Sequence, residues 1–166
     1  MKILLVEPEL NSGKLLPETP SRALLILGTL AQQRGHEVKI LHLNLSKVPF
    51  SDELSQFCPE VIGITVNSFQ VKSARIIAKE AKDFGAKVIL GGPHASAWND
   101  NTVDKKVIGE GENAWRSFIG ENYPSSGPPL EYEKVNIDYI PIPNYDLVDL
   151  DRFCCIAPVG ITPAMA

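Results

Sequence analysis

The sequence predicts a doubly wound α/β domain with a five-stranded parallel sheet, and two observations lead to that fold class. Over residues 1–122, short apolar runs rich in β-branched residues alternate with longer amphipathic runs. The two clearest helical runs each end in a glycine, Gly35 and Gly85, and a strand-like run begins within two residues. Such short helix-to-strand connections imply parallel strands joined by right-handed crossovers. The sequence therefore favours a flavodoxin- or Rossmann-like sheet with flanking helices.

Five apolar runs supply the predicted strands, at residues 2–6, 37–43, 61–66, 87–90 and 105–108. The first run follows Met1 almost directly and ends at Glu7 and Pro8. It is too short for a signal peptide, so we interpret it as the first buried strand.

Four runs between and after these strands predict helices, at residues 21–34, 51–57, 69–84 and 113–122. Ser21 and Ser51 are expected to cap the first two. In the run 69–84, apolar residues recur at spacings of three and four, which predicts one stripe packed on the sheet. The helical run 21–34 is apolar nearly all round, so we expect this helix to be covered on two sides.

The pattern changes at residue 123. Seven of the thirteen prolines lie in the last 43 residues, and no helical or strand period of any length continues there. Residues 123–166 are therefore predicted to be a linker or extended arm, not a second folded domain. The apolar residues between Tyr139 and Leu150 indicate that this arm lies against either this domain or a neighbouring one.

Length and composition narrow the class of protein. A chain of 166 residues, 44% hydrophobic and 22% charged, suits one soluble domain with an appendage. A net charge of −4 argues against a nucleic-acid partner, and no apolar run is long enough to span a membrane. Three cysteines form neither a disulfide framework nor a paired CxxC site. We expect a cytoplasmic protein.

Small and polar residues follow the predicted strands, where ligands bind in open parallel sheets. The candidate binding residues are Thr65, Asn67, Ser68, Gly91, Gly92, Pro93, His94, Ser96, Gly109, Glu110 and Gly111. This set suits a site that hydrogen-bonds amides and hydroxyls, with glycines that let a flat ligand approach the backbone. It lacks the positioned pair of titratable groups that acid–base or nucleophilic catalysis needs, so we predict no catalytic residues and no metal ligands.

Each motif also has a structural interpretation. Gly91-Gly92 and Gly109-Glu110-Gly111 can equally be tight turns, and Glu110 can be an acid at a helix N-terminus. A lone histidine such as His94 is more often a capping or surface group than a ligand. Trp98 and Trp115 are expected to be packing residues.

Taken in order, five segments resemble a known family: MKILLVEP, LAQQRGHEVKILHLN, PEVIGITVNS, GAKVILGGPHAS and VIGEGE. They are similar to the cobalamin (vitamin B12)-binding domain that precedes the radical S-adenosylmethionine (SAM) barrel in cobalamin-dependent radical SAM enzymes. The resemblance covers residues 1–122, and IPIPNYDLVDLDRF resembles the linker into that barrel. The CxxxCxxC cluster motif of the barrel does not follow, so the resemblance implies that a [4Fe–4S] cluster and SAM belong to a barrel domain or subunit missing from this chain.

The resemblance extends to individual residues. Family members of the methionine-synthase type supply a histidine to cobalt from the loop after the first strand. Here the loop from Glu7 to Pro20 contains no histidine, which implies cobalamin bound without a protein histidine. The family's S-x-L element corresponds to residues 65–67, with Asn67 in place of leucine, and its paired glycine to Gly91-Gly92. On this reading Gly92→Val should block the nucleotide tail in a folded domain, and Asn67→Leu should be tolerated.

The sequence leaves two functions open. The first is the cobalamin-binding module of a methyltransferase-like radical SAM enzyme. The alternative is a corrinoid-free α/β docking or regulatory domain that has kept the fold and lost the cofactor. A phosphoacceptor receiver is disfavoured because Glu7 has no acidic neighbour and Asn67 replaces an aspartate. A dinucleotide enzyme is disfavoured because no G-x-G-x-x-G follows the first strand.

Overall fold

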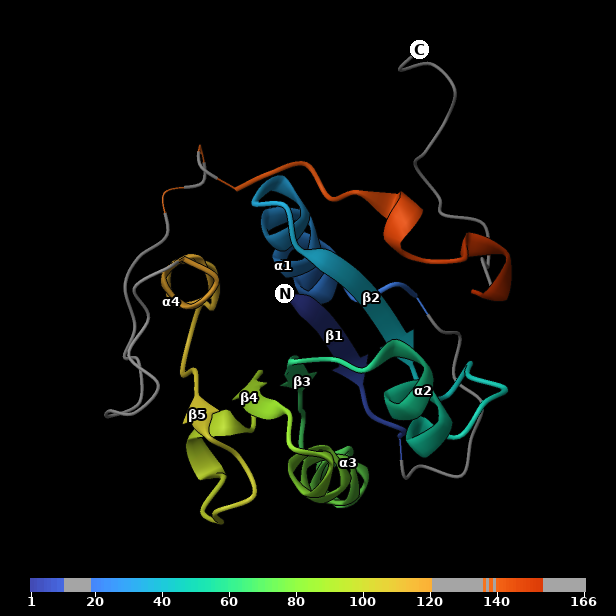
Figure 1. Cartoon of the computed structure of the whole chain (residues 1–166). Coiled ribbons are helices and arrows are strands. Elements are labelled where there is room, and N and C mark those ends of the chain that lie inside the picture. The colour runs from blue at the N-terminus through green and yellow to red at the C-terminus, as the bar shows by residue number, and fades with distance from the viewer. Residues whose placement is uncertain (11–18, 121–135, 137, 139, 154–166) are drawn as a thin grey trace.

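Five parallel strands form a single twisted sheet in the computed structural model, which describes residues 1–10, 19–120, 136, 138 and 140–153. The strands are β1 (Lys2–Glu7), β2 (Glu37–His42), β3 (Val61–Thr65), β4 (Lys87–Gly91) and β5 (Lys105–Lys106), in the order β2-β1-β3-β4-β5 (Figure 1). This order confirms the predicted doubly wound fold class. It also places the reversal of strand order between β1 and β3, where such sheets bind ligands.

Helices cover both faces of the sheet. They are α1 (Arg22–Gln33), α2 (Phe50–Phe57), α3 (Val71–Phe84) and α4 (Glu112–Phe118), with short 3₁₀ turns η1 (Ala95–Ala97), η3 (Tyr145–Leu147) and η4 (Leu150–Arg152). In Figure 1, α2 and α3 lie on one side of the sheet and α1 and α4 on the other. Among the described residues, no helix is long and apolar enough to cross a membrane.

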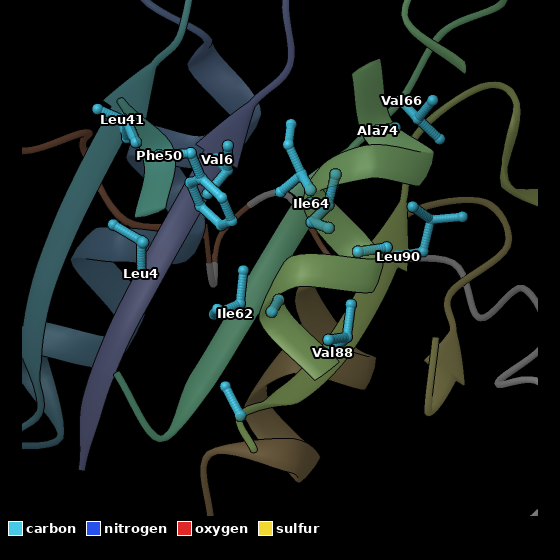
Figure 2. Close-up of a cluster of buried hydrophobic side chains, with 14 of the residues drawn as sticks. Leu4, Val6, Leu41, Phe50, Ile62, Ile64, Val66, Ala74, Val88 and Leu90 are labelled. Atoms are coloured by element: carbon cyan, nitrogen blue, oxygen red, sulfur yellow. The ribbon is translucent and has the colours of Figure 1, made fainter. Parts of the chain in front are cut away.

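Strand residues alternate between two buried clusters, as the period of two requires. Leu4, Ile62 and Val88 pack toward α2 and α3, whose Phe50 and Ala74 cover them (Figure 2). On the opposite face, a second group of strand residues packs against α1 and α4: Ile3, Leu5, Ile40, Val61 and Ile89. The second face carries the candidate site.

The helix ends follow the sequence only in part. Gly85 caps α3 with φ +95°, as its left-handed C-cap role predicts. Ser21 occupies the N-cap of α1, but its side chain makes no capping hydrogen bond. The predicted Ser51 cap is wrong, because Pro49 occupies the N-cap and Ser51 lies inside α2. The edge strand β5 is shorter than expected, although the Val107 amide still donates to the Leu90 carbonyl at 2.8 Å.

Residues 140–153 cross over α1 toward β2 and pack on this domain (Figure 1). The Asn144 amide nitrogen donates to the Thr29 hydroxyl at 2.8 Å, and the Asn144 side chain donates to Gln32 at 3.0 Å. Phe153 meets the His42 ring edge-on, with centroids 4.9 Å apart. The sequence left open whether this segment packs on its own domain or on a neighbouring one. In the structure it packs on its own domain. Cys154, Cys155, Tyr139 and the predicted boundary at 122/123 lie outside the described residues.

Candidate functional site

A narrow apolar pocket lies between α1 and α4 toward the carboxyl ends of the strands, and we call it the α1–α4 slot. Its volume is about 70 Å³. The residues that line it are Leu5, Ala23, Leu24, Leu27, Gly63, Ile64, Thr65, Ile89, Gly91, Val107, Gly111 and Trp115. Three of these, Thr65, Gly91 and Gly111, belong to the residues predicted from sequence.

Gly91 is the residue that leaves space in this slot. It ends β4 directly opposite Thr65 of β3. A Cβ built on Gly91 would meet no atom within 4 Å, and Gly91 is not among the glycines with positive φ. The backbone here accepts any residue, so the missing side chain serves the open space and not the turn.

Gly92 has the opposite role. Its φ is +98°, and a Cβ built on it would lie 2.7 Å from the Val66 carbonyl oxygen and 2.8 Å from the Val66 nitrogen. Real Cβ atoms do not approach backbone atoms so closely, and L-residues rarely adopt this φ. This geometry argues against the sequence-based expectation that Gly92→Val leaves the domain folded. Gly91 therefore leaves open space in the slot, whereas Gly92 is required by the turn. The sequence alone did not assign these two roles to one glycine or the other.

Backbone hydrogen bonds hold the loops after β3 and β4 together. The Val66 amide donates to the Gly91 carbonyl at 2.9 Å, and the His94 amide donates to the Val66 carbonyl at 3.1 Å. The Ser68 hydroxyl lies 3.2 Å from His94 Nδ1, within hydrogen-bond distance. The structure therefore brings Ser68, Gly91 and His94 close together in the loops beside the slot.

Asn67 is half-buried and its side chain already has a structural partner. Its Oδ1 accepts a hydrogen bond from the Phe69 amide at 2.9 Å. Its backbone amide donates to the Gln70 side chain at 3.1 Å. Asn67 therefore shapes the loop after β3 through local hydrogen bonds.

The other predicted residues lie farther out. Pro93, Ser96, Gly109 and Glu110 are exposed. In the described part of the chain, the slot lining includes Gly111, the N-cap of α4, but none of these four.

Beneath the loop after β4, the buried Trp98 side chain anchors the chain. The Arg75 guanidinium lies 5.5 Å from the Trp98 ring centroid and donates to Asp100 at 3.0 Å. Burial raises the pKa of Asp100, but hydrogen bonds from Thr102 and Arg75 outweigh it and hold that pKa below its ordinary value of 3.8. The ionised carboxylate thus fastens the loop to α3.

Nine slot residues were not among the predicted site residues, and two of them, Gly63 and Trp115, have a recognisable role. Gly63 interrupts an apolar β-branched strand, a signal for close approach of another group. Trp115, predicted as a packing residue, is indeed buried, and its indole also donates to the Leu27 carbonyl at 2.8 Å. This hydrogen bond joins α4 to α1 across the slot.

The apolar slot and the polar loops beside it lie at the carboxyl edge of a doubly wound sheet, where sheets of this class bind ligands. The model of the B12 binding domain matches residues 10–119. The chain belongs to the B12-binding domain family.

Two curated relatives are similar over most of this chain. It is 30% identical over 185 residues to the uncharacterized methyltransferase PH0819 of Pyrococcus horikoshii, covering 92% of this chain and 40% of that protein. It is 30% identical over 145 residues to the uncharacterized methyltransferase sll1242 of Synechocystis, covering 84% of this chain and 26% of that protein. The chain therefore spans less than half the length of either relative.

Among solved structures, the fold resembles part of the radical SAM methyltransferase TsrM of Kitasatospora setae. The TM-score is 0.58 at 24% identity, over 71% of this chain and 25% of that one. One of the TsrM structures holds cobalamin and a [4Fe–4S] cluster.

Proposed function

We propose that this chain binds cobalamin at the carboxyl edge of its sheet, with the nucleotide tail of the cofactor in the α1–α4 slot. The observation that carries the proposal is the open space at Gly91, where a side chain would be tolerated by the backbone but would fill the slot. Membership of the B12-binding domain family supports it.

The chemistry of the site fits this cofactor. Benzimidazole is flat and apolar, as are the slot walls formed by Leu24, Leu27 and Trp115. However, small-molecule pockets usually measure about 300–1,000 Å³, whereas the slot measures about 70 Å³. Entry of the tail therefore requires α1 and α4 to separate, which stretches the Trp115–Leu27 hydrogen bond.

Polar groups at the rim would hold the rest of the cofactor. Thr65 lines the slot, while Ser68 and His94 lie in the adjoining loops. These groups suit the amide arms and phosphate of the cofactor. Bound cobalamin would supply a cobalt centre able to carry a methyl group. The loop from Glu7 to Pro20 has no histidine, so we propose that cobalt takes no protein imidazole from it.

We further propose that the chain is the cobalamin-binding part of a radical SAM methyltransferase. The names of the two curated relatives and the fold of TsrM support this assignment. Since the chain spans 40% or less of those proteins, the barrel with its [4Fe–4S] cluster and SAM would belong to sequence outside this chain.

The test is direct binding of hydroxocobalamin to the purified chain. After mixing and desalting, we expect corrin absorbance to remain with the protein at near-equal molar amounts. Cobinamide, which has the corrin ring but lacks the nucleotide, is the matched ligand control and should be retained far less. Absence of retained corrin absorbance would contradict the proposal, and equal retention of both ligands would contradict the slot as the site of the tail.

The alternative of a corrinoid-free docking domain has one observation in its favour. Ile142, Tyr145 and Leu150 are exposed on the outer side of residues 140–153. In the same segment Phe153 is buried and Leu147 is partly buried against this domain, so these apolar side chains already have a partner within the chain. Failure to retain cobalamin, together with capture of a separately encoded barrel protein, would favour this alternative.

A further inference from the structure

Gln70 is a buried amide that joins two loops at the candidate site. Its side chain lies just before α3 and is 2% exposed. The Gln70 Nε2 donates to the Pro8 carbonyl at 3.0 Å, and Oε1 accepts from the Asn67 amide at 3.1 Å. One donor bond and one acceptor bond fix the orientation of the amide.

The two joined loops follow neighbouring strands. Pro8 comes directly after β1, and Asn67 lies in the loop after β3. Strand order reverses between β1 and β3, and ligands of doubly wound sheets bind at that point. One side chain therefore links Pro8 and Asn67 at the point where strand order reverses.

A second contact from α3 reaches the same loop and provides a comparison. The Glu9 amide donates to the Ser73 hydroxyl at 3.2 Å, in exposed surroundings. Water can replace this bond when the hydroxyl is removed. It cannot easily replace the Gln70 bonds, because Gln70 and Pro8 are fully buried.

We propose that Gln70 is a positioning residue for the cofactor, acting through Pro8 and Asn67 without touching the ligand. This inference rests on the proposed binding of cobalamin. Gln70 holds Pro8, directly after β1, and Asn67, in the loop after β3, at the separation that admits the corrin edge.

Two substitutions separate this role from simple packing. Gln70→Met keeps the length of the side chain but removes both hydrogen bonds. Gln70→Glu removes the donor only while the carboxylate is ionised, because the protonated acid donates to Pro8 and accepts from Asn67. Burial raises the pKa of a carboxyl group, so protonation is reached at mildly acidic pH.

The experiment measures the cobalamin dissociation constant of each folded variant relative to wild type at the same pH, so that titration of the cofactor cancels. We expect Gln70→Met to bind about tenfold more weakly, as the loss of two buried hydrogen bonds implies. Gln70→Glu should be weakened at about pH 8 and return toward wild type at about pH 5. Ser73→Ala, the matched control, should bind within about twofold of wild type because its bond is exposed.

Unchanged binding by folded Gln70→Met, or equal weakening of Gln70→Glu at every pH, would overturn the inference while leaving the proposed function intact. Absence of binding by wild type would overturn both. If Gln70→Met does not fold, the pH profile of Gln70→Glu decides the question, since its protonated form keeps both hydrogen bonds.

Discussion

The two flanks of α1 use glycine in different ways. On the flank facing β2, a Cβ on Gly28 would lie 2.8 Å from Cδ1 of Leu147, so the chain fills the notch with its own side chain. On the flank facing α4, a Cβ built on Gly91 of β4 would meet no atom within 4 Å. At Gly28 the absence of a side chain has a structural role, because Leu147 occupies the space. At Gly91 the corresponding space is available to a ligand.

The largest effect is expected at Gly92, where the backbone conformation and the nearby Val66 backbone leave no room for a side chain. Gly92→Val should destabilise the domain by about 3 kcal/mol or more, because it combines positive φ with a clash against the Val66 backbone. Urea unfolding followed by circular dichroism measures this change. A variant as stable as wild type would show that the loop after β4 can rearrange freely.

The filled flank can be tested with Leu147→Ala. Leu147 is partly buried against the apolar cluster of α1, so its truncation should lower the free energy of unfolding by about 2 kcal/mol.

The same flank offers a double-mutant cycle. In the Leu147→Ala background, Gly28→Ala should stabilise α1 by up to about 1 kcal/mol, because alanine is the better helix residue and the clash is gone. In the wild-type background that gain should be reduced or reversed. Equal effects in both backgrounds would mean that Leu147 does not occupy the notch.

A smaller effect is expected at the rim. Asn67→Leu removes the hydrogen bond from the Phe69 amide and should lower stability by about 1 kcal/mol. Retention of hydroxocobalamin should remain near wild type, because leucine is the family's residue at this position. Loss of retention in a folded Asn67→Leu protein would give the Asn67 side chain a direct part in binding.

The features that could be predicted from sequence depend on local chemistry. The glycine end of α3, the four apolar strands β1 to β4 and the small residues after β3 and β4 all follow from residue types and spacing. The predicted Ser51 cap was wrong because the N-cap of α2 is Pro49, whose fixed φ allows the helix to begin at Phe50.

The features that could not be predicted depend on contacts between distant segments. Gly91 and Gly92 look equivalent in sequence, and only the position of the Val66 backbone distinguishes them. The slot walls combine Leu27 of α1 with Trp115 of α4, which are 88 residues apart. Gln70 was predicted only as part of a helix, and its burial against Pro8 emerges from the packing of α3 on the sheet.

The central claim is that the space at Gly91 exists for a ligand, and Gly91→Val tests it most directly. Valine suits the end of a β-strand, so stability should change by no more than about 0.5 kcal/mol. Ala97→Val places the same side chain at an exposed position of the same loop and serves as the control. We expect Gly91→Val to be folded and to retain no hydroxocobalamin, while wild type and Ala97→Val retain it. A folded Gly91→Val protein that holds cobalamin as tightly as wild type would contradict the claim.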